Sequence, residues 1–167
     1  ALPIYKYKCE GCAHRDLVPL DDAIIRRHLH KGAKETDILG LYPIMEDNTC
    51  FFLCADFDDK NCQHGYKDDV LSYVGVCNDW NIPVYIERSR SGNGAHLWIF
   101  FSEPVSAALA RKLGFAILGS AMERNAQLDM KSYDRFFPNQ DFVPKGGFGN
   151  LVALPLQGDA KHKGNSL

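Results

Sequence analysis

The sequence predicts an α+β fold in which helices cover one face of a mainly antiparallel sheet. Strand-like and helical patterns are mixed along the chain, in the order strands, helix, two strands, helix, strands. The segment 49–60, TCFFLCADFDDK, begins with an apolar run rich in aromatic residues, which is typical of a strand buried on both faces. Since 167 residues can bury a substantial core, we expect a single domain over 1–167 with its core in 36–167.

The N-terminal part, residues 1–35, contains half of a zinc-binding pattern ahead of a helix. Cys9 and Cys12 in CEGC have the spacing of a zinc knuckle, and residues 20–30 have the capping and apolar spacing of a helix. His28 on that helix is the candidate third ligand. Three residues are contenders for the fourth ligand: His14, His30 and Cys50. The alternative is a pair of reduced thiols in a turn.

The core is predicted to open with a hairpin formed by residues 37–44 and 49–60. Because strand side chains alternate between faces, Asp56 and Asp58 should share one side of the sheet while Phe57 returns to the core. Neighbouring carboxylates at the end of a buried strand repel each other, and Mg²⁺ or Mn²⁺ would relieve that repulsion. The alternative is a strand end followed by a solvated acidic turn.

A helix over 66–80 leads to a glycine-rich turn between two further strands, 84–86 and 96–101. In this turn, RSRSGNG, Gly92 and Gly94 allow backbone N–H groups to converge on an anion. The turn is therefore a candidate phosphate site.

Three side chains beside this turn are suited to phosphate. Arg88 and Arg90 have planar guanidinium groups with several donors, and His96 opens the following strand, where its ring can hydrogen-bond to a phosphate oxygen. The alternative is an ordinary hairpin with exposed arginines and a histidine that bonds to the backbone. The phosphate interpretation depends on the pairing of this turn with the two acids described above.

The last third of the chain combines a long helix with a second group of acids. Residues 105–124 predict a helix, and the segment 128–135 contains Asp129, Asp134 and Arg135. A loop over 136–140, a second glycine-rich turn over 145–150, a short strand over 151–156 and a polar tail over 157–167 complete the predicted elements. Three aromatic residues in the loop and turn are either base-stacking groups or core: Phe136, Phe137 and Phe148.

Composition excludes few functions. The hydrophobic share of 46% and the charged share of 24% are ordinary for a globular protein. The sequence has no signal peptide and no apolar run of spanning length, so we expect a cytoplasmic protein with no membrane partner. The chain begins at Ala1 and stops after GNSL, which we interpret as a piece of a longer protein.

Several stretches resemble the archaeo-eukaryotic primase superfamily. The segments LGLYPIMEDNTCFFLCADFD, SRSGNGAHLWIFF, SYDRFFPNQD and GGFGNLVALPLQG are similar to the primase-polymerases of mobile-element conflict systems and to CRISPR-associated primase-polymerases. The resemblance covers nearly the whole chain and keeps three motifs in order. It implies the primase catalytic fold, an RRM-like antiparallel sheet combined with a second α/β part.

The resemblance also implies an activity, that of a DNA primase-polymerase. Such an enzyme makes or extends primers from nucleoside triphosphates on single-stranded DNA by two-metal catalysis, with Mg²⁺ or Mn²⁺ as cofactor. Asp56 and Asp58 match the first motif as metal ligands, and Asp134 matches the third. Asp129 fits the third motif in a competing register.

The second motif of the family corresponds to the glycine-rich turn. His96, together with Ser91, Gly92 and Gly94, would contact the phosphates of the incoming nucleotide. Four cations are candidates to offset the charge of the triphosphate and the template: Arg88, Arg90, Arg135 and Lys145.

Two other functions stay open at this point. One is a catalytically inactive module that binds nucleic acid with the primase fold, and the other is a metal-dependent nuclease. The resemblance further implies that the chain is fused to, or encoded with, other defence or mobile-element proteins. The preference for ribo- or deoxyribonucleotides, and the choice between priming and extension, are not predicted.

Overall fold

The structure is a computed structural model that describes residues 20–30, 32, 38–59, 65–124, 130–145 and 147–167. Helices and strands are mixed along the described chain, as expected of an α+β fold. In chain order the elements are α1 (Asp22–Leu29), β1 (Gly40–Leu41), β2 (Thr49–Asp58), α2 (Tyr66–Asp79), β3 (Tyr85–Arg88), β4 (Gly94–Ser106), α3 (Ala107–Arg124), β5 (Tyr133–Phe137), β6 (Val152–Ala153) and α4 (Gly158–His162).

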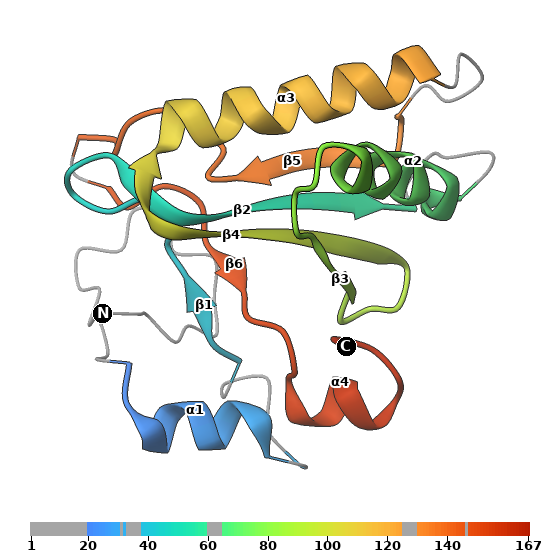
Figure 1. The fold of residues 1–167 in the computed structure, drawn as a ribbon. Coiled ribbons are helices and arrows are strands. Elements are labelled where there is room, and N and C mark those ends of the chain that lie inside the picture. The colour runs from blue at the N-terminus through green and yellow to red at the C-terminus, as the bar shows by residue number, and fades with distance from the viewer. Residues whose placement is uncertain (1–19, 31, 33–37, 60–64, 125–129, 146) are drawn as a thin grey trace.

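Four strands form an antiparallel sheet in the order β3-β4-β2-β5. The strand β2 lies inside this sheet because its apolar side chains are buried on both faces. Helices α2 and α3 lie together over one face (Figure 1). The core between them includes Leu53 and Phe57 of β2, Tyr73 of α2 and Ile117 of α3.

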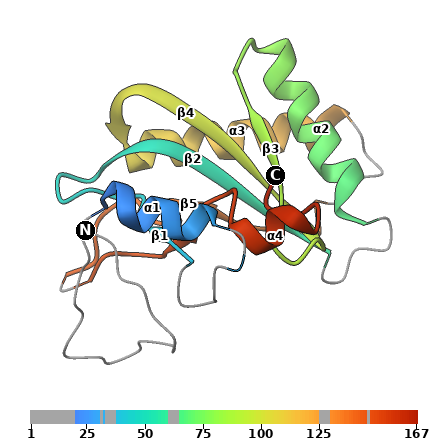
Figure 2. The same ribbon diagram turned by 90° about the horizontal axis from the view of Figure 1, so that it is seen from below.

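The strands β1 and β6 form a separate two-stranded antiparallel sheet on the other side of the main sheet, and α1 and α4 lie beyond it (Figures 1 and 2). A second apolar cluster joins the two sheets: Phe52, Cys54, Trp98, Phe137 and Val152. The antiparallel sheet and the second α/β part that the resemblance implies are therefore both present.

The predicted hairpin between 37–44 and 49–60 is wrong. The strand β1 has only two residues, and it pairs with β6 through Gly40 opposite Ala153. Both edges of β2 are hydrogen-bonded, to β4 and to β5, so β2 has no edge left for β1. Adjacency in the sequence does not lead to pairing here.

The strand β4 extends beyond the predicted range 96–101 and includes Pro104, so α3 begins at Ala107 instead of residue 105. The register between β2 and β4 shifts between Cys50 and Phe52. Pro104 lies opposite this shift, where the strand does not need the ladder hydrogen bond that proline cannot donate.

The strand β5 includes Phe136 and Phe137, which the sequence predicts to lie in a loop. Their side chains are 2% and 7% exposed, and they point to opposite faces of the sheet. Neither ring is accessible to a nucleobase, so of the two alternatives left open for Phe136 and Phe137 the structure supports the core role. Phe148 packs against Tyr42, with 5.2 Å between the ring centroids.

Residues 157–167 are not the free polar tail that we predicted. The Gln157 side chain caps α4 by accepting a hydrogen bond from the Ala160 N–H (2.8 Å). Beyond α4, the backbone N–H of Ser166 donates to the Arg88 carbonyl (2.7 Å), and the Arg88 N–H donates to the Leu167 carbonyl (2.8 Å). The end of the described chain therefore lies along β3, as both ribbon views show (Figures 1 and 2).

Gly114→Ala should destabilise the fold, whereas Gly119→Ala on the same helix should not. A Cβ added at residue 114 would lie 2.6 Å from Cζ of Phe136 and 3.0 Å from a methyl group of Leu53. A Cβ at residue 119 meets nothing within 4 Å, and alanine favours the helix. In urea denaturation followed by circular dichroism, we expect Gly114→Ala to lose roughly 1–3 kcal/mol and Gly119→Ala to lose nothing. Equal stabilities would contradict the close packing of α3 on the sheet.

Candidate active site

Two carboxylates emerge near the end of β2, on the face of the sheet that turns away from α2 and α3. Asp56 lies opposite His96 of β4, and Asp58 lies opposite Gly94. Phe57 between them is 0% exposed and belongs to the core under the two helices. The predicted alternation along this strand is therefore confirmed.

A third carboxylate reaches the same place because β5 contains an irregularity. The register of β2 and β5 shifts between Asp56, which pairs with Arg135, and Phe57, which pairs with Tyr133. Asp134 is thus the extra residue of a β-bulge, and a bulge changes the direction of a side chain without breaking the sheet. Asp129, the competing candidate, lies outside the described residues.

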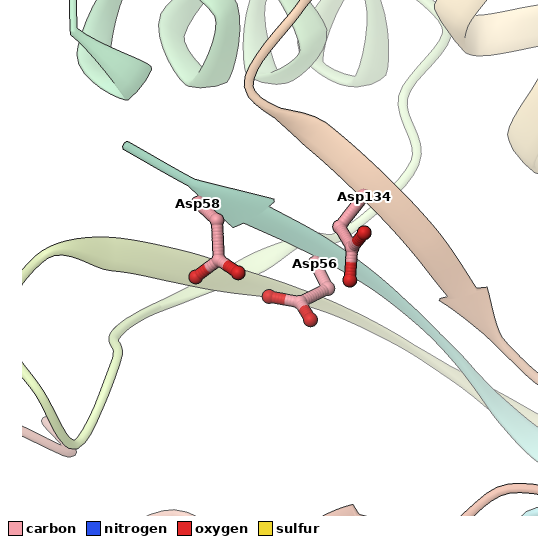
Figure 3. A group of neighbouring side chains, drawn as sticks. All are labelled: Asp56, Asp58 and Asp134. Atoms are coloured by element: carbon pink, nitrogen blue, oxygen red, sulfur yellow. The ribbon is translucent and has the colours of Figure 1, made fainter. Parts of the chain in front are cut away.

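The carboxylates of Asp56, Asp58 and Asp134 converge on one space (Figure 3). Each offers an oxygen, and the three oxygens lie within 4.8 Å of one another. Oxygen atoms at this separation can ligate one hard cation jointly or hold two side by side. The donor set therefore fits Mg²⁺ or Mn²⁺, the cations that the sequence predicts.

The charge balance of this cluster is unfavourable without a cation. Burial raises the pKa of Asp56 to about 6, and the negative charges of Asp58 and Asp134 add to the rise while His96 and Arg135 oppose it. Arg135 Nε donates to an oxygen of Asp134 over 2.8 Å, which offsets part of the charge. A bound divalent cation would offset the remainder.

His96 lies between the acid cluster and a buried glutamate. Its Nε2 is 3.5 Å from an oxygen of Asp56, and its Nδ1 is 2.9 Å from Oε2 of Glu87. Burial would lower the pKa of His96, but the hydrogen bond and charge of Glu87 and the charges of Asp56 and Asp58 raise it overall. The contacts of its two ring nitrogens with Asp56 and Glu87 hold the imidazole beside the carboxylates.

Sequence reasoning missed Glu87. The predicted strand 84–86 ended one residue before it, whereas β3 continues through Arg88. A lone glutamate after a strand gives no signal of its role, since its burial depends on its position opposite His96 in the sheet. Only the pairing of β3 with β4 shows that Glu87 lies on the same face as the acids.

The glycine-rich turn closes tightly between β3 and β4. The Ser89 N–H donates to the Gly94 carbonyl (2.9 Å), and the Gly92 N–H donates to the Ser89 carbonyl (2.9 Å). Gly92 has a φ of +82°, which favours glycine. A cavity of about 520 Å³ opens beside the turn and the acid cluster, lined by Asp58, Asp59, Ser91 and Asn93.

Gly94 is needed for a different reason from Gly92. A Cβ at residue 94 would collide with the carbonyl oxygen of Phe57 and lie 3.2 Å from an oxygen of Asp58. The backbones of β2 and β4 therefore approach each other closely beside Asp58, and this approach brings the turn next to the acid cluster.

A scan against protein-family models matches residues 3–167 to the archaeo-eukaryotic primase domain of the TOTE conflict system. The chain belongs to this family. A comparison with curated proteins finds no match. Membership confirms the resemblance that the sequence motifs indicate, and it supports primase-fold nucleotidyl transfer as the class of chemistry.

In this primase domain the four predicted cations take different positions. Arg135 contacts the acid cluster through Asp134. Arg88 donates through Nε to the Gly92 carbonyl (3.2 Å) and so supports the turn, and the neighbouring Arg90 side chain is exposed. Lys145 is exposed in the segment after β5, and its role stays a prediction.

The structure argues against His28 as a zinc ligand of the primase domain. The ring is 2% exposed, its Nδ1 accepts from the Leu39 N–H (3.1 Å), and its Nε2 lies 2.9 Å from the Pro155 carbonyl. Because both ring nitrogens are used, none is free for a metal. The cysteines of the CEGC pattern, Cys9 and Cys12, lie outside the described residues.

The three candidates for the fourth zinc ligand differ in their position and burial. His14 lies outside the described residues. His30 follows α1 as an exposed residue whose backbone N–H donates to the Arg27 carbonyl. Cys50 is 0% exposed in β2, and burial raises the pKa of its thiol to about 11. Since zinc binds the thiolate, Cys50 is unsuited to the role.

The helices described in this primase domain include none that is long and apolar enough to cross a membrane.

Asp56→Asn should stabilise the metal-free protein at neutral pH. The pKa of Asp56 in the folded protein, about 6, lies above the ordinary value of 3.8 for an aspartate, so ionisation of Asp56 costs stability as the pH rises through this interval. We expect a gain in unfolding free energy on the order of 1–3 kcal/mol at pH 7.5, measured with a chelator present. The gain should vanish near pH 4, where the wild-type carboxyl is protonated.

The matched control for this prediction is Asp68→Asn, which changes an exposed acid in the first turn of α2. Its stability should follow that of the wild type at both pH values. An Asp56→Asn variant that is less stable than wild type at pH 7.5 would show that the carboxylate is not under electrostatic strain.

Proposed function

We propose that this primase domain catalyses template-directed nucleotidyl transfer, making or extending primers from nucleoside triphosphates on single-stranded DNA. One observation supports this proposal above the others. Three aspartate carboxylates from β2 and β5 converge within 4.8 Å beside a glycine-rich turn and a cavity of about 520 Å³. A triphosphate with its cations requires a site of this kind, with acidic ligands on one side and phosphate donors on the other.

Asp56, Asp58 and Asp134 would hold Mg²⁺ or Mn²⁺ in this site. When bound, the cations lower the pKa of the attacking hydroxyl and stabilise the negative charge that develops on the phosphoryl oxygens. The carboxylates fit the role because their oxygens are close together and their charges are only partly offset by Arg135.

In the proposed reaction the 3′-hydroxyl of a primer, or of a first nucleotide, attacks the α-phosphate of a nucleoside triphosphate. The new O–P bond forms as the bond to pyrophosphate breaks, and the hydroxyl proton leaves to solvent. His96, whose Nε2 lies 3.5 Å from an oxygen of Asp56, would contact the phosphates. The N–H groups of Ser89, Gly92 and Asn93 already donate within the glycine-rich turn, so the exposed Arg90 would be the further donor there.

The family description supports a partner class as well. It names a conflict system, and we propose that the domain acts with other proteins of such a system, as fused parts or as separate chains. Its substrate there would be single-stranded DNA exposed during conflict between genetic elements.

Two competing functions make different predictions in a single assay. A labelled single-stranded DNA template is incubated with Mg²⁺ or Mn²⁺, with and without nucleoside triphosphates, and with and without a primer. A primase-polymerase gives longer or new products only when nucleotides are present. A nuclease shortens the template without nucleotides, and an inactive binding module leaves every strand unchanged while it retards the template on a native gel.

Asp58→Asn and Asp134→Asn should each reduce nucleotide incorporation by about 100-fold or more, because each removes a charged ligand from the shared space. Binding of single-stranded DNA, measured by fluorescence anisotropy, should change by less than about threefold. Asp68→Asn serves as the control and should keep full activity. Wild-type incorporation by either of the first two variants would contradict the metal assignment.

His96→Ala should weaken nucleotide binding more than template binding. We expect KM for the incoming nucleotide to rise about tenfold, as for the loss of one hydrogen bond to a charged group, while affinity for the template stays the same. The comparison uses steady-state incorporation for the nucleotide and anisotropy for the template. Equal losses for both ligands would rule out a specific contact with the triphosphate.

A further inference from the structure

Glu87 is a buried carboxylate that none of the proposed catalytic steps uses. Its side chain belongs to β3, the edge strand of the main sheet, yet the residue is only 4% exposed. Its position opposite His96 places it on the same face as the acid cluster. A buried carboxylate costs folding free energy unless hydrogen-bond donors surround it. The donors around Glu87 therefore indicate the role of this side chain.

Three side chains contact the two oxygens of Glu87. Oε2 is 2.9 Å from Nδ1 of His96 and accepts from Nε1 of Trp98, also at 2.9 Å. Oε1 accepts from Oγ of Ser166 at 3.1 Å. The indole of Trp98 can only donate, and a carboxylate can only accept, so these contacts are consistent with an ionised Glu87.

The contact with Glu87 determines which nitrogen of His96 faces the acid cluster. Because the carboxylate accepts, Nδ1 of His96 must bear the hydrogen that it donates to Oε2. The Nε2 edge is then directed to Asp56, 3.5 Å away. Rotation of the ring about its bond to Cβ would break the bond to Glu87, and the same oxygen is held from the other side by Trp98.

Ser166 ties this arrangement to a segment that is distant in the sequence. Its Oγ donates to Glu87 and accepts from the Gln157 N–H (3.3 Å). Its backbone is fixed on both sides, by the Arg88 carbonyl (2.7 Å) and by the Leu156 N–H (2.8 Å). Ser166 is therefore buried and ordered beside β3, with 1% exposure.

We propose that Glu87 is a positioning residue that holds the imidazole of His96 with Nε2 towards the acid cluster, and that Ser166 holds Glu87 in turn. The consequence for substrate rests on the function proposed above: Nε2 of His96 is presented in one orientation to the phosphates of the nucleotide. Loss of Glu87 frees the ring to turn, so it weakens nucleotide binding without removing any group that touches the nucleotide.

The test compares Glu87→Ala with Glu87→Gln in the full chain. A glutamine keeps the shape, its amide oxygen can accept from His96 and Trp98, and its amide nitrogen can donate to Oγ of Ser166. Glu103→Ala is the matched control, because Glu103 is an exposed glutamate on the neighbouring strand β4. Ser166→Ala removes the partner of Oε1, together with the acceptor of the Gln157 N–H, and it serves if Glu87→Ala does not fold.

The first measurement needs no activity. Nitrogen-15 spectra of the histidine rings report whether each ring nitrogen bears a hydrogen, and we expect His96 in one ring state, with a hydrogen on Nδ1 whether or not Nε2 is also protonated, in the wild type, in Glu87→Gln and in Glu103→Ala. In Glu87→Ala, and to a smaller extent in Ser166→Ala, the His96 signals should shift to the average of two forms. Unchanged His96 signals in both variants would overturn the proposal, whether or not the protein incorporates nucleotides.

The second measurement concerns the substrate. With Mn²⁺ present, the Kd of a non-hydrolysable nucleoside triphosphate should rise about tenfold in Glu87→Ala and about twofold in Ser166→Ala, and stay near wild type in Glu87→Gln. In turnover, KM for the nucleotide should rise while kcat changes by less than about threefold. A fall in kcat at constant KM, or an equal loss in Glu87→Gln, would contradict a positioning role. Failure of wild type to incorporate nucleotides, with the ring signals as expected, would refute the proposed function alone.

Discussion

The antiparallel pairing of β2 with β4 on one edge and β5 on the other is the constraint on which the site depends. The strand β2 supplies only Asp56 and Asp58, β4 brings His96 opposite the first of them, and β5 brings Asp134. A slip of one residue in this pairing would turn both carboxylates of β2 into the core and force Phe57 to the surface, which the apolar face under α2 and α3 does not allow. The burial that stabilises the sheet therefore also determines the geometry of the acid cluster.

The cluster itself opposes stability, which is an argument for function. Three like charges share a space in which Arg135 and His96 offset part of the charge on Asp56, and burial together with the charges of Asp58 and Asp134 raises the pKa of Asp56 to about 6. A structural role would be served better by neutral or oppositely charged residues at these positions. Groups that are held in an unfavourable electrostatic arrangement by a well-packed sheet are typical of sites that bind a cation or a charged substrate.

Local patterns in the sequence predicted one part of the site, and pairing between distant strands decided the rest. The shared side of Asp56 and Asp58 follows from the alternation of a single strand, so it could be predicted. Asp134 reaches them through a bulge that no sequence pattern marks, and its selection depended on the family motif. The role of Glu87 arises from its partners on β4 and near the end of the chain. His28 was wrongly assigned as a zinc ligand for the same reason: the Pro155 carbonyl, which lies beside its Nε2, is far along the sequence.

The second sheet, formed by β1 and β6, affects how much of the acid cluster is exposed to solvent. On the face that carries the acids, Phe52 and Cys54 are covered by the cluster that includes Val152 of β6, while Asp56, two residues further along, is partly accessible. The apolar cluster thus ends between Cys54 and Asp56, and Asp56 lies at its edge. A carboxylate deeper under this layer would stay protonated and could not bind a cation, and one further out would be fully solvated and only weakly selective. The position of β6 therefore limits how far the apolar cover extends towards Asp56, and burial is the main cause of the raised pKa of that carboxyl.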